Sequence, residues 1–247
     1  MTNNRLVVVH PDPQVLAAAA AARLLTRILD LQSVASPVHI VLTGGTVGIA
    51  TLAQVAASPL RDAVDWTGVH VWWGDERYLP AGDPDRNEVQ AHAALLDHLE
   101  LLPAANIHVM PAAVPGVDSE AAAQEYAAEL KAFAPAGADV PAFDVLMLGM
   151  GPDAHVASLF PGHAGLDVTG RPTTGIEDSP KPPPSRVSLT FNAITSAREV
   201  WIIAAGAEKA QAVADGLAGA DTSIAPVAGA TGSERTLWLL DTAAASE

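Results

Sequence analysis

The sequence contains no cysteine and few cations. The lack of cysteine excludes disulfide bonds, thiolate nucleophiles and cysteine-ligated metals, and it suits a reducing compartment. Only 13 lysines and arginines stand against 28 aspartates and glutamates, which gives a formal net charge of −15 at pH 7. That charge argues against nucleic acid and anionic membranes as general partners. An anionic ligand needs a site that gathers the scarce cations, so an arginine or lysine beside a glycine turn is informative.

Long apolar runs are also missing. No segment approaches the roughly 20 apolar residues that span a membrane, and residues 1–5 show no signal-like hydrophobic region. The sequence therefore predicts a cytoplasmic protein. Hydrophobic residues still make up 49% of the 247 residues, which is ample for a buried core that needs no disulfide bond or metal.

What is present is a regular alternation of short apolar segments with helix-forming segments, without an internal repeat or a shift in composition. This pattern predicts an α/β fold in which one doubly wound, mainly parallel sheet carries helices on both faces, as in Rossmann-like proteins. We expect one catalytic domain over residues 1–247, with a proline-rich surface loop at about 171–185. The predicted strands cover residues 6–10, 38–42, 69–73, 107–109, 143–148, 186–190, 199–205 and 236–240.

Residues 144–161 form the centre of the predicted chemistry. An apolar run breaks at Gly149 and Gly151, and Asp153 and His155 follow, which predicts a buried strand, a tight turn and the start of a short helix. Open α/β sheets bind ligands at the carboxyl ends of their strands, and an imidazole there can carry protons near neutral pH. A lone loop histidine is more often structural, and two glycines without a third make a weak dinucleotide motif. Other segments therefore have to support a catalytic histidine.

One such segment is the turn formed by Gly44, Gly45 and Thr46, which ends a predicted strand and opens a helix. Glycines let backbone N–H groups face a ligand, and the start of a helix favours anions, so phosphate is the expected ligand. A plain turn, with Thr46 capping the helix, explains the same residues equally well.

Charged residues follow two further strands. Arg77 comes directly after Asp75 and Glu76, and its planar fork of donors can hold a phosphate while one of the acids orients it. A surface salt bridge is the alternative interpretation. Lys209 likewise follows a glycine after a strand, although a solvated helix lysine is the commoner case. Asn87 is expected to cap the helix that follows it.

The carboxyl ends of parallel strands share one edge of the sheet. We therefore expect one crevice to collect four side chains, namely Thr46, Arg77, His155 and Lys209. The remaining histidines that we considered show no metal-ligand spacing and are expected to be ordinary surface or helix histidines: His92, His98, His108 and His163. The residues by themselves predict an anion-binding cleft with one imidazole and no metal.

Five segments, in order along nearly the whole chain, resemble the 6-phosphogluconolactonase family. They are residues 43–46, residues 73–77 with Asn87, residues 148–153 with His155 to Pro161, residues 181–184 with Arg186, and Gly206 with Lys209. This resemblance implies hydrolysis of 6-phospho-D-glucono-1,5-lactone to 6-phosphogluconate in the oxidative pentose phosphate pathway. It implies a small sugar phosphate lactone as the partner, and no metal or organic cofactor.

The resemblance also implies roles for individual residues. His155 is the expected general base that takes a proton from the water attacking the lactone, and Asp153 and Asp75 are alternatives for orienting it. One of the cations could instead face the oxyanion. The family usually has glycine in place of Ala154, which constrains the backbone if that position needs a positive φ. The residues implied in phosphate or substrate binding are Gly44, Gly45, Thr46, Arg77, Gly151, Arg186 and Lys209.

Two other functions remain as alternatives. Glucosamine-6-phosphate deaminase/isomerase resembles the chain in fold, in the glycine turn and in the Asp-x-His pair, but it has a glutamate where this chain has Phe160, and an apolar ring cannot act as acid or base. A non-catalytic sugar-phosphate sensor would carry a DNA-binding segment, and the chain shows no basic helical extension. The sequence leaves open whether the protein is a monomer or a small homo-oligomer.

Overall fold

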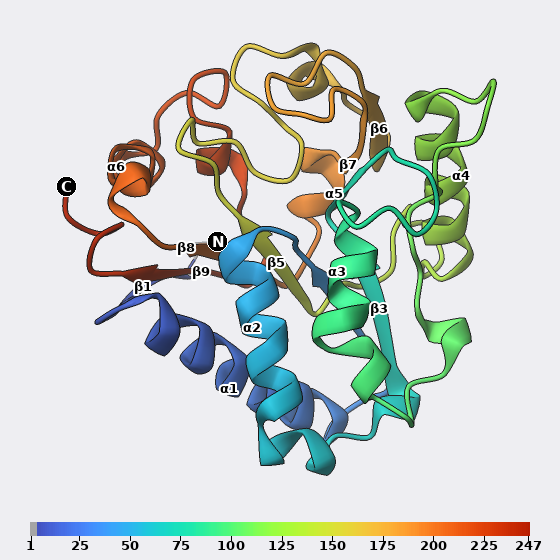
Figure 1. Ribbon diagram of the computed structural model, residues 1–247, viewed down its shortest axis with the longest axis vertical. Coiled ribbons are helices and arrows are strands. Elements are labelled where there is room, and N and C mark those ends of the chain that lie inside the picture. Colours follow the sequence, from blue (N-terminus) through green and yellow to red (C-terminus); the bar gives the residue numbers. More distant parts are fainter. Residues whose placement is uncertain (1–3) are drawn as a thin grey trace.

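A six-stranded parallel sheet forms the centre of the computed structural model, which describes residues 4–247 (Figure 1). The strand order is β1-β9-β8-β5-β2-β3, and every hydrogen-bonded pair runs parallel. The chain moves outward from β2 to β3, returns to β5 and then moves outward the other way, so the winding reverses between β2 and β5. In doubly wound sheets the ligand crevice lies at this point. The strands are β1 (Asn4–His10), β2 (Val38–Leu42), β3 (Val69–Trp73), β5 (Val145–Gly149), β8 (Glu199–Ala204) and β9 (Arg235–Asp241).

Helices cover both faces of this sheet. The α1 helix lies beside Trp201 and Leu237, whereas α6 packs on Trp238, the next residue of the same strand, which points to the opposite face. Rings of α4 and its C-cap pack against Trp72 on the α6 side, and α1 and α2 lie side by side (Figure 1). The predicted doubly wound fold is confirmed. The helices are α1 (Pro13–Gln32), α2 (Thr46–Ala57), α3 (Asn87–Ala94), α4 (Ser119–Ala132), α5 (Phe191–Ile194) and α6 (Ala210–Ala218).

Short 3-10 helices make up much of the connecting chain. They are η1 (Pro59–Ala63), η2 (Trp66–Gly68), η3 (Leu96–His98), η4 (Ala104–Asn106), η5 (Ala164–Asp167), η6 (Ala207–Lys209) and η7 (Pro226–Gly229). No helix within residues 4–247 is long and apolar enough to cross a membrane.

A second sheet of three antiparallel strands corrects two sequence-based expectations. Its order is β4-β7-β6, with β4 at Asp75–Arg77, β7 at Arg186–Leu189 and β6 at Thr173–Ile176. Residues 75–77 were expected in a loop, and β6 falls within the predicted loop at 171–185. Both strands form because β7 pairs with each of them. The β4–β7 pairing joins segments more than a hundred residues apart and leaves little local signal.

The predicted helix start after Gly151 is wrong. The chain instead turns back on itself through isolated bridges that join Val156 to Met150 and to Leu159. Ala154 and Ala157 have φ values of 63° and 50°, in the left-handed region that a right-handed helix cannot contain. The expected strand at 107–109 is reduced to one bridge between Ile107 and Val71, while the other predicted strands of the main sheet and β7 are confirmed to within two residues.

The apolar core of the described residues is one connected cluster that runs through all layers. The α1 helix shows how the sequence builds it: Asp12 caps the first turn by accepting the N–H of Val15, and Pro13 occupies the first helical position. Its buried side chains recur every three or four residues, so one stripe faces the sheet. That stripe comprises Leu16, Ala17, Ala20, Ala21, Leu24, Leu25 and Ile28.

Candidate active site

A cavity of about 720 Å³ opens where β2, β5 and β8 end, and residues from all four predicted turns line it. This position matches the reversal of winding in the sheet. Nine of the ten predicted site residues lie on its wall: Gly44, Gly45, Thr46, Asp75, Arg77, Gly151, His155, Arg186 and Lys209. The tenth, Asp153, contacts the ring of His155.

His155 is held by Asp153 and by the backbone of its own turn. Nδ1 of the ring lies 2.6 Å from Oδ1 of Asp153, and the His155 carbonyl accepts the N–H of Gly151 at 3.0 Å. A proton on Nδ1 that is donated to Asp153 leaves Nε2 as the acceptor nitrogen. The side chain is 19% exposed, and its ring centroid lies 4.6 Å from that of Phe160. One face of the imidazole is therefore packed while the ring reaches the cavity.

Gly151 is the residue that makes room for this pair. A Cβ atom at position 151 would lie 2.0 Å from Nδ1 of His155 and 2.2 Å from Oδ1 of Asp153. Such distances are far shorter than van der Waals contact. The predicted role of Gly151 in binding substrate stays a prediction, but its lack of a side chain is what allows Asp153 and His155 to meet.

Ala154 lies between these two residues with a φ of 63°. The position does have the positive φ that favours glycine, so the departure from the usual family residue places a Cβ in a left-handed conformation. That conformation costs about 1–2 kcal/mol for a residue other than glycine.

Lys181 is a site residue that the sequence-based prediction missed. Its Nζ donates to Oδ1 of Asp153 at 2.9 Å and lies 3.1 Å from Nδ1 of His155, and it lines the cavity. Burial opposes ionisation of Asp153, but hydrogen bonds from His155 and Lys181 hold the pKa of its carboxyl well below the usual range. The sequence offered one signal for Lys181, namely that it is one of few cations in this chain.

Asp75 has a different partner from the one expected. Its Oδ2 accepts the hydroxyl of Ser158 at 2.8 Å, and Asp153 alone of the two predicted acids bonds to His155. The alternative in which Asp75 orients the imidazole is therefore wrong for this structure. Asp75 remains on the cavity wall, nearly buried, with a negative charge beside the arginines.

Two arginines stand opposite each other across the β4–β7 ladder, where Arg77 pairs with Arg186. Arg77 is partly exposed, and its Nη1 donates to the Asp85 carbonyl at 2.5 Å. Arg186 is only 6% exposed, and burial lowers its pKa, with Asp75 opposing and Arg77 reinforcing that shift. Two guanidinium groups therefore meet at the cavity in a chain of strongly negative net charge.

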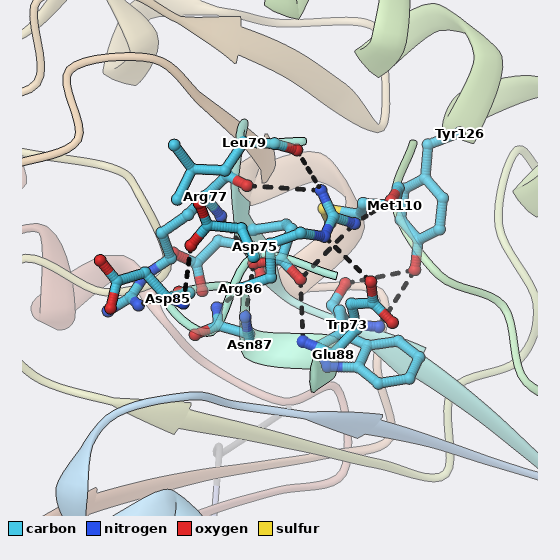
Figure 2. Close-up of polar contacts among 12 residues, drawn as sticks. Trp73, Asp75, Arg77, Leu79, Asp85, Arg86, Asn87, Glu88, Met110 and Tyr126 are labelled. Atoms are coloured by element: carbon cyan, nitrogen blue, oxygen red, sulfur yellow. Dashed lines mark hydrogen bonds and ion pairs between the residues drawn. The ribbon is translucent and has the colours of Figure 1, made fainter. Parts of the chain in front are cut away.

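A buried network holds the Arg77 strand in place (Figure 2). Arg86, 1% exposed, donates to the carbonyls of Met110 at 2.7 Å and Leu79 at 3.1 Å. Glu76 accepts the backbone N–H groups of Arg77, Asn87 and Glu88 at 2.7, 2.7 and 2.9 Å. Burial raises the pKa of Glu76 to about 7, while Arg86 and the three N–H donors lower it. Glu76 thus fixes the Arg77 backbone and the first turn of α3.

Asn87 does not cap α3, contrary to expectation, because Arg86 occupies the cap position and Glu76 takes the N–H groups. Its Nδ2 donates instead to the Asp75 carbonyl at 2.9 Å. Its Oδ1 lies so near Gly44 that a Cβ there would be 1.9 Å away. Asn87 therefore joins β4 to the glycine turn.

The glycine turn presents the start of α2 to the cavity. Gly45 is the N-cap with a φ of 78°, and no side chain caps this helix. The predicted alternative in which Thr46 caps α2 is therefore wrong. Thr46 is exposed, and its hydroxyl has no hydrogen-bond partner within residues 4–247. The first N–H groups of a helix lack internal partners and favour anions, so this turn provides a suitable phosphate site.

Lys209 reaches the cavity from the end of η6, after Gly206 with a φ of 102°. Burial lowers its pKa, Glu208 opposes that shift, and the charge of Lys181 reinforces it. Its ammonium makes no hydrogen bond or ion pair in the part of the chain that the structure describes. Lys209 is thus a cation available to a ligand.

A histidine cluster on β2, β3 and the following chain corrects the expectation for His108. This residue is 2% exposed; its Nδ1 lies 2.6 Å from Glu129 and its Nε2 lies 2.8 Å from His70. The ring of His39 is tilted by 32° against that of His70, with the centroids 4.9 Å apart, and it accepts the indole N–H of Trp72 at 3.1 Å. None of these side chains lines the cavity, and no group of three potential ligands within residues 4–247 is arranged to hold a metal.

Comparison with known proteins agrees with this geometry. The family model described as glucosamine-6-phosphate isomerases/6-phosphogluconolactonase matches residues 11–238. The chain is 55% identical to the 6-phosphogluconolactonase of Streptomyces coelicolor, over all of this chain and 96% of that protein. It is 45% identical to the 6-phosphogluconolactonase of Mycobacterium leprae, over 98% of this chain and 97% of the relative.

Solved structures show the same fold. The 6-phosphogluconolactonase of Trypanosoma brucei superposes with a TM-score of 0.84 at 29% identity, covering 99% of each chain. A monomeric glucosamine-6-phosphate deaminase superposes with a TM-score of 0.78 at 17% identity, covering 98% of this chain and 99% of the other. The fold therefore accommodates both chemistries, and the site residues have to distinguish them.

Proposed function

The chain belongs to the glucosamine-6-phosphate isomerase/6-phosphogluconolactonase family, and we propose that His155 is the general base with which it hydrolyses 6-phospho-D-glucono-1,5-lactone. The product is 6-phosphogluconate, as the oxidative pentose phosphate pathway requires. The contact that carries this mechanism is the one between His155 and Asp153 on the wall of a cation-lined cavity.

In the proposed reaction, Nε2 of His155 takes a proton from a water molecule as the water oxygen bonds to the lactone carbonyl carbon. The carbon–oxygen bond to the ring oxygen then breaks, and the imidazolium returns the proton to that oxygen. The products are a carboxylate, after its own proton leaves, and a free hydroxyl. Asp153 stabilises the imidazolium that forms between the two steps, in the manner of a His–Asp pair.

The phosphate binds at the other side of the cavity in this proposal. The first N–H groups of α2 and the Thr46 hydroxyl donate to its oxygens, and Arg77 and Lys209 neutralise its charge. Nη1 of Arg186 has no partner within residues 4–247, which makes it a further donor. Because the cations on the cavity wall attract a phosphate group, the site should bind phosphorylated sugars more tightly than neutral sugars.

Phe160 favours the lactonase over the deaminase. A deaminase of this fold needs an acid at that position for ring opening, and Phe160 is 1% exposed and packed against His155. An aromatic ring there supplies no proton. The cavity also holds no other carboxylate in contact with His155 besides Asp153 among the described residues.

Two assays test the activity. Purified protein mixed with fresh lactone should release protons faster than the spontaneous hydrolysis, whereas glucosamine 6-phosphate should yield no ammonia. For the mechanism, His155→Asn should lower kcat by about 10²-fold or more with KM nearly unchanged, because the base acts only in the transition state. Near wild-type turnover by His155→Asn would remove it from the mechanism. We further expect a cytoplasmic protein whose partner is the sugar phosphate lactone and not nucleic acid.

A further inference from the structure

The proline-rich segment 177–185 delivers a cation to the catalytic pair. Nζ of Lys181 touches Oδ1 of Asp153 at 2.9 Å, the same oxygen that accepts the His155 ring N–H. The segment closes on itself, since Ser179 donates its N–H to the Pro184 carbonyl and its hydroxyl to the Lys181 carbonyl, both at 2.9 Å. The turn thereby fixes the direction in which Lys181 extends.

Arg186 anchors this turn through hydrogen bonds to its backbone carbonyls. Its Nε donates to the Pro183 carbonyl at 2.8 Å, and its Nη2 donates to the carbonyls of Pro182 and Lys181 at 2.8 and 3.1 Å. The guanidinium is buried and lies on β7, which the pairing with β4 and β6 holds rigid. Three consecutive carbonyls are thus fixed to one rigid group, and Lys181 is the first of them.

Nδ1 of His155 cannot donate to Asp153 and also accept from Lys181. At 2.6 Å the bond to Asp153 is the shorter one, so the proton on Nδ1 points to the carboxylate, and the ammonium at 3.1 Å is a neighbouring charge rather than a hydrogen-bond donor to the ring. Lys181 therefore acts on the ring through the Asp153 carboxylate oxygen that both side chains share.

We propose that Lys181, fastened by Arg186, is a positioning residue of the hydrolysis: it locks the Asp153 carboxylate onto Nδ1 of His155. This inference rests on the proposed role of His155. Asp153 is 33% exposed, and a carboxylate open to water rotates unless donors hold it. Two donors on one oxygen remove that freedom, so Nε2 faces the cavity in one orientation.

A phosphate ligand at Lys181 is the competing role. The substrate carries its phosphate on the carbon outside the ring, away from the lactone carbonyl that reacts. A cation in contact with the base lies at the reacting end of the substrate, whereas Thr46 and Lys209 are free of partners within residues 4–247 and remain available for the phosphate. The observed contacts of Lys181 therefore favour positioning over phosphate binding.

The test compares Lys181→Met and Lys181→Arg with the wild-type protein. Lys131→Met serves as the matched control, because Lys131 lies on α4, pairs with the exposed Asp139 and does not line the cavity. For each protein, kcat and KM are measured, together with inhibition by 6-phosphogluconate. We expect Lys181→Met to lower kcat by roughly tenfold or more and to leave KM and inhibition within about twofold. Lys181→Arg, which keeps a donor to Asp153, should restore most of kcat, and Lys131→Met should match wild type.

Two outcomes overturn the inference. An unchanged kcat with a raised KM and weakened inhibition would make Lys181 a phosphate ligand, and wild-type values in Lys181→Met would give it no part in the reaction. Both are separable from failure of the proposed mechanism, which His155→Asn reports independently. Circular dichroism of Lys181→Met checks the fold, and Arg186→Lys, which keeps the charge but lacks the planar fork of donors that holds the three carbonyls, should reproduce the loss in kcat.

Discussion

Oδ1 of Asp153 accepts the ring N–H of His155 at 2.6 Å, although the two residues are only two positions apart in the same turn. Ala154 lies between them with a φ of 63°, and Gly151 leaves the space in which the two side chains meet. The catalytic pair is therefore a local product of one strained turn, whereas the cations around it come from distant segments.

Replacing the carboxylate should separate charge from shape in this pair. Asp153→Asn keeps the size of the side chain but removes the charge that stabilises the imidazolium, and the amide can present its NH₂ group to Nδ1 and thus select the wrong tautomer. We expect kcat to fall by about 10²-fold or more with little change in KM. Steady-state kinetics checks this, and a change confined to KM would assign Asp153 to substrate binding.

Arg77 and Lys209 should act on affinity rather than on the chemical step. Removing either charge by substitution with alanine leaves one fewer donor for the phosphate, so KM should rise by about tenfold or more while kcat changes little. Arg23→Ala is the control, because Arg23 is exposed on α1, outside the lining of the cavity. Loss of kcat alone in either variant would place that cation at the reacting carbonyl.

Gly151→Ala should remove activity without unfolding the protein. The added Cβ would lie 2.0 Å from Nδ1 of His155, so the two catalytic side chains have to rotate apart, and a displacement of about 1 Å can lower turnover by about 10²-fold. Gly74→Ala is the matched control, since its Cβ would meet Leu148 at an ordinary 3.5 Å. A Gly151→Ala protein with wild-type kcat would show that the turn opens readily.

The histidine cluster should make the fold sensitive to acid. Burial, and then the charges of His70 and His108, lower the pKa of His39 from 6.5 to about 4. Burial also lowers the pKa of His108, although Glu129 opposes that shift. Between pH 6.5 and pH 4, His39 binds a proton in the unfolded chain but not in the folded protein. Folding stability therefore falls as the pH drops from 6.5 to 4, by up to about 3 kcal/mol from His39.

Urea unfolding at pH 7 and pH 5 measures this effect by comparison with His39→Gln, which cannot titrate. The comparison is needed because Glu76, with its pKa raised to about 7, contributes stability below pH 4.5 that is lost as the pH rises through 7. The variant should lose less stability on acidification than the wild-type protein. An equal loss in both proteins would exclude His39 as the source.

The sequence was sufficient to predict the main sheet because its signals are local. A buried parallel strand appears as a short apolar run, and a glycine turn followed by a helix marks its carboxyl end, so the placing of His155 and Arg77 at one edge needed only the fold class. The identity of the orienting acid was not accessible from this pattern, because Asp75 and Asp153 both follow strands. Only their partners in the folded chain distinguish them, since Asp75 bonds to Ser158 and Asp153 bonds to His155.

Interactions between distant segments account for what was missed. In the β4–β7–β6 sheet, β4 depends on pairing with β7 over more than a hundred residues, which local preference does not encode. Lys181 sits in a proline-rich segment that reads as a surface loop, and only the Arg186 contacts direct it inward. His108 was assigned to the surface for the same reason, since its burial under α4 depends on tertiary packing and not on its neighbours in sequence.

Arg77 and Arg186 are paired positions of β4 and β7, so their charges lie close together in the folded protein. Like charges held at neighbouring positions repel, and Asp75 offsets part of that repulsion at Arg186. An anion that contacts both guanidinium groups would offset more of it, so we expect inorganic phosphate to raise the midpoint temperature of unfolding.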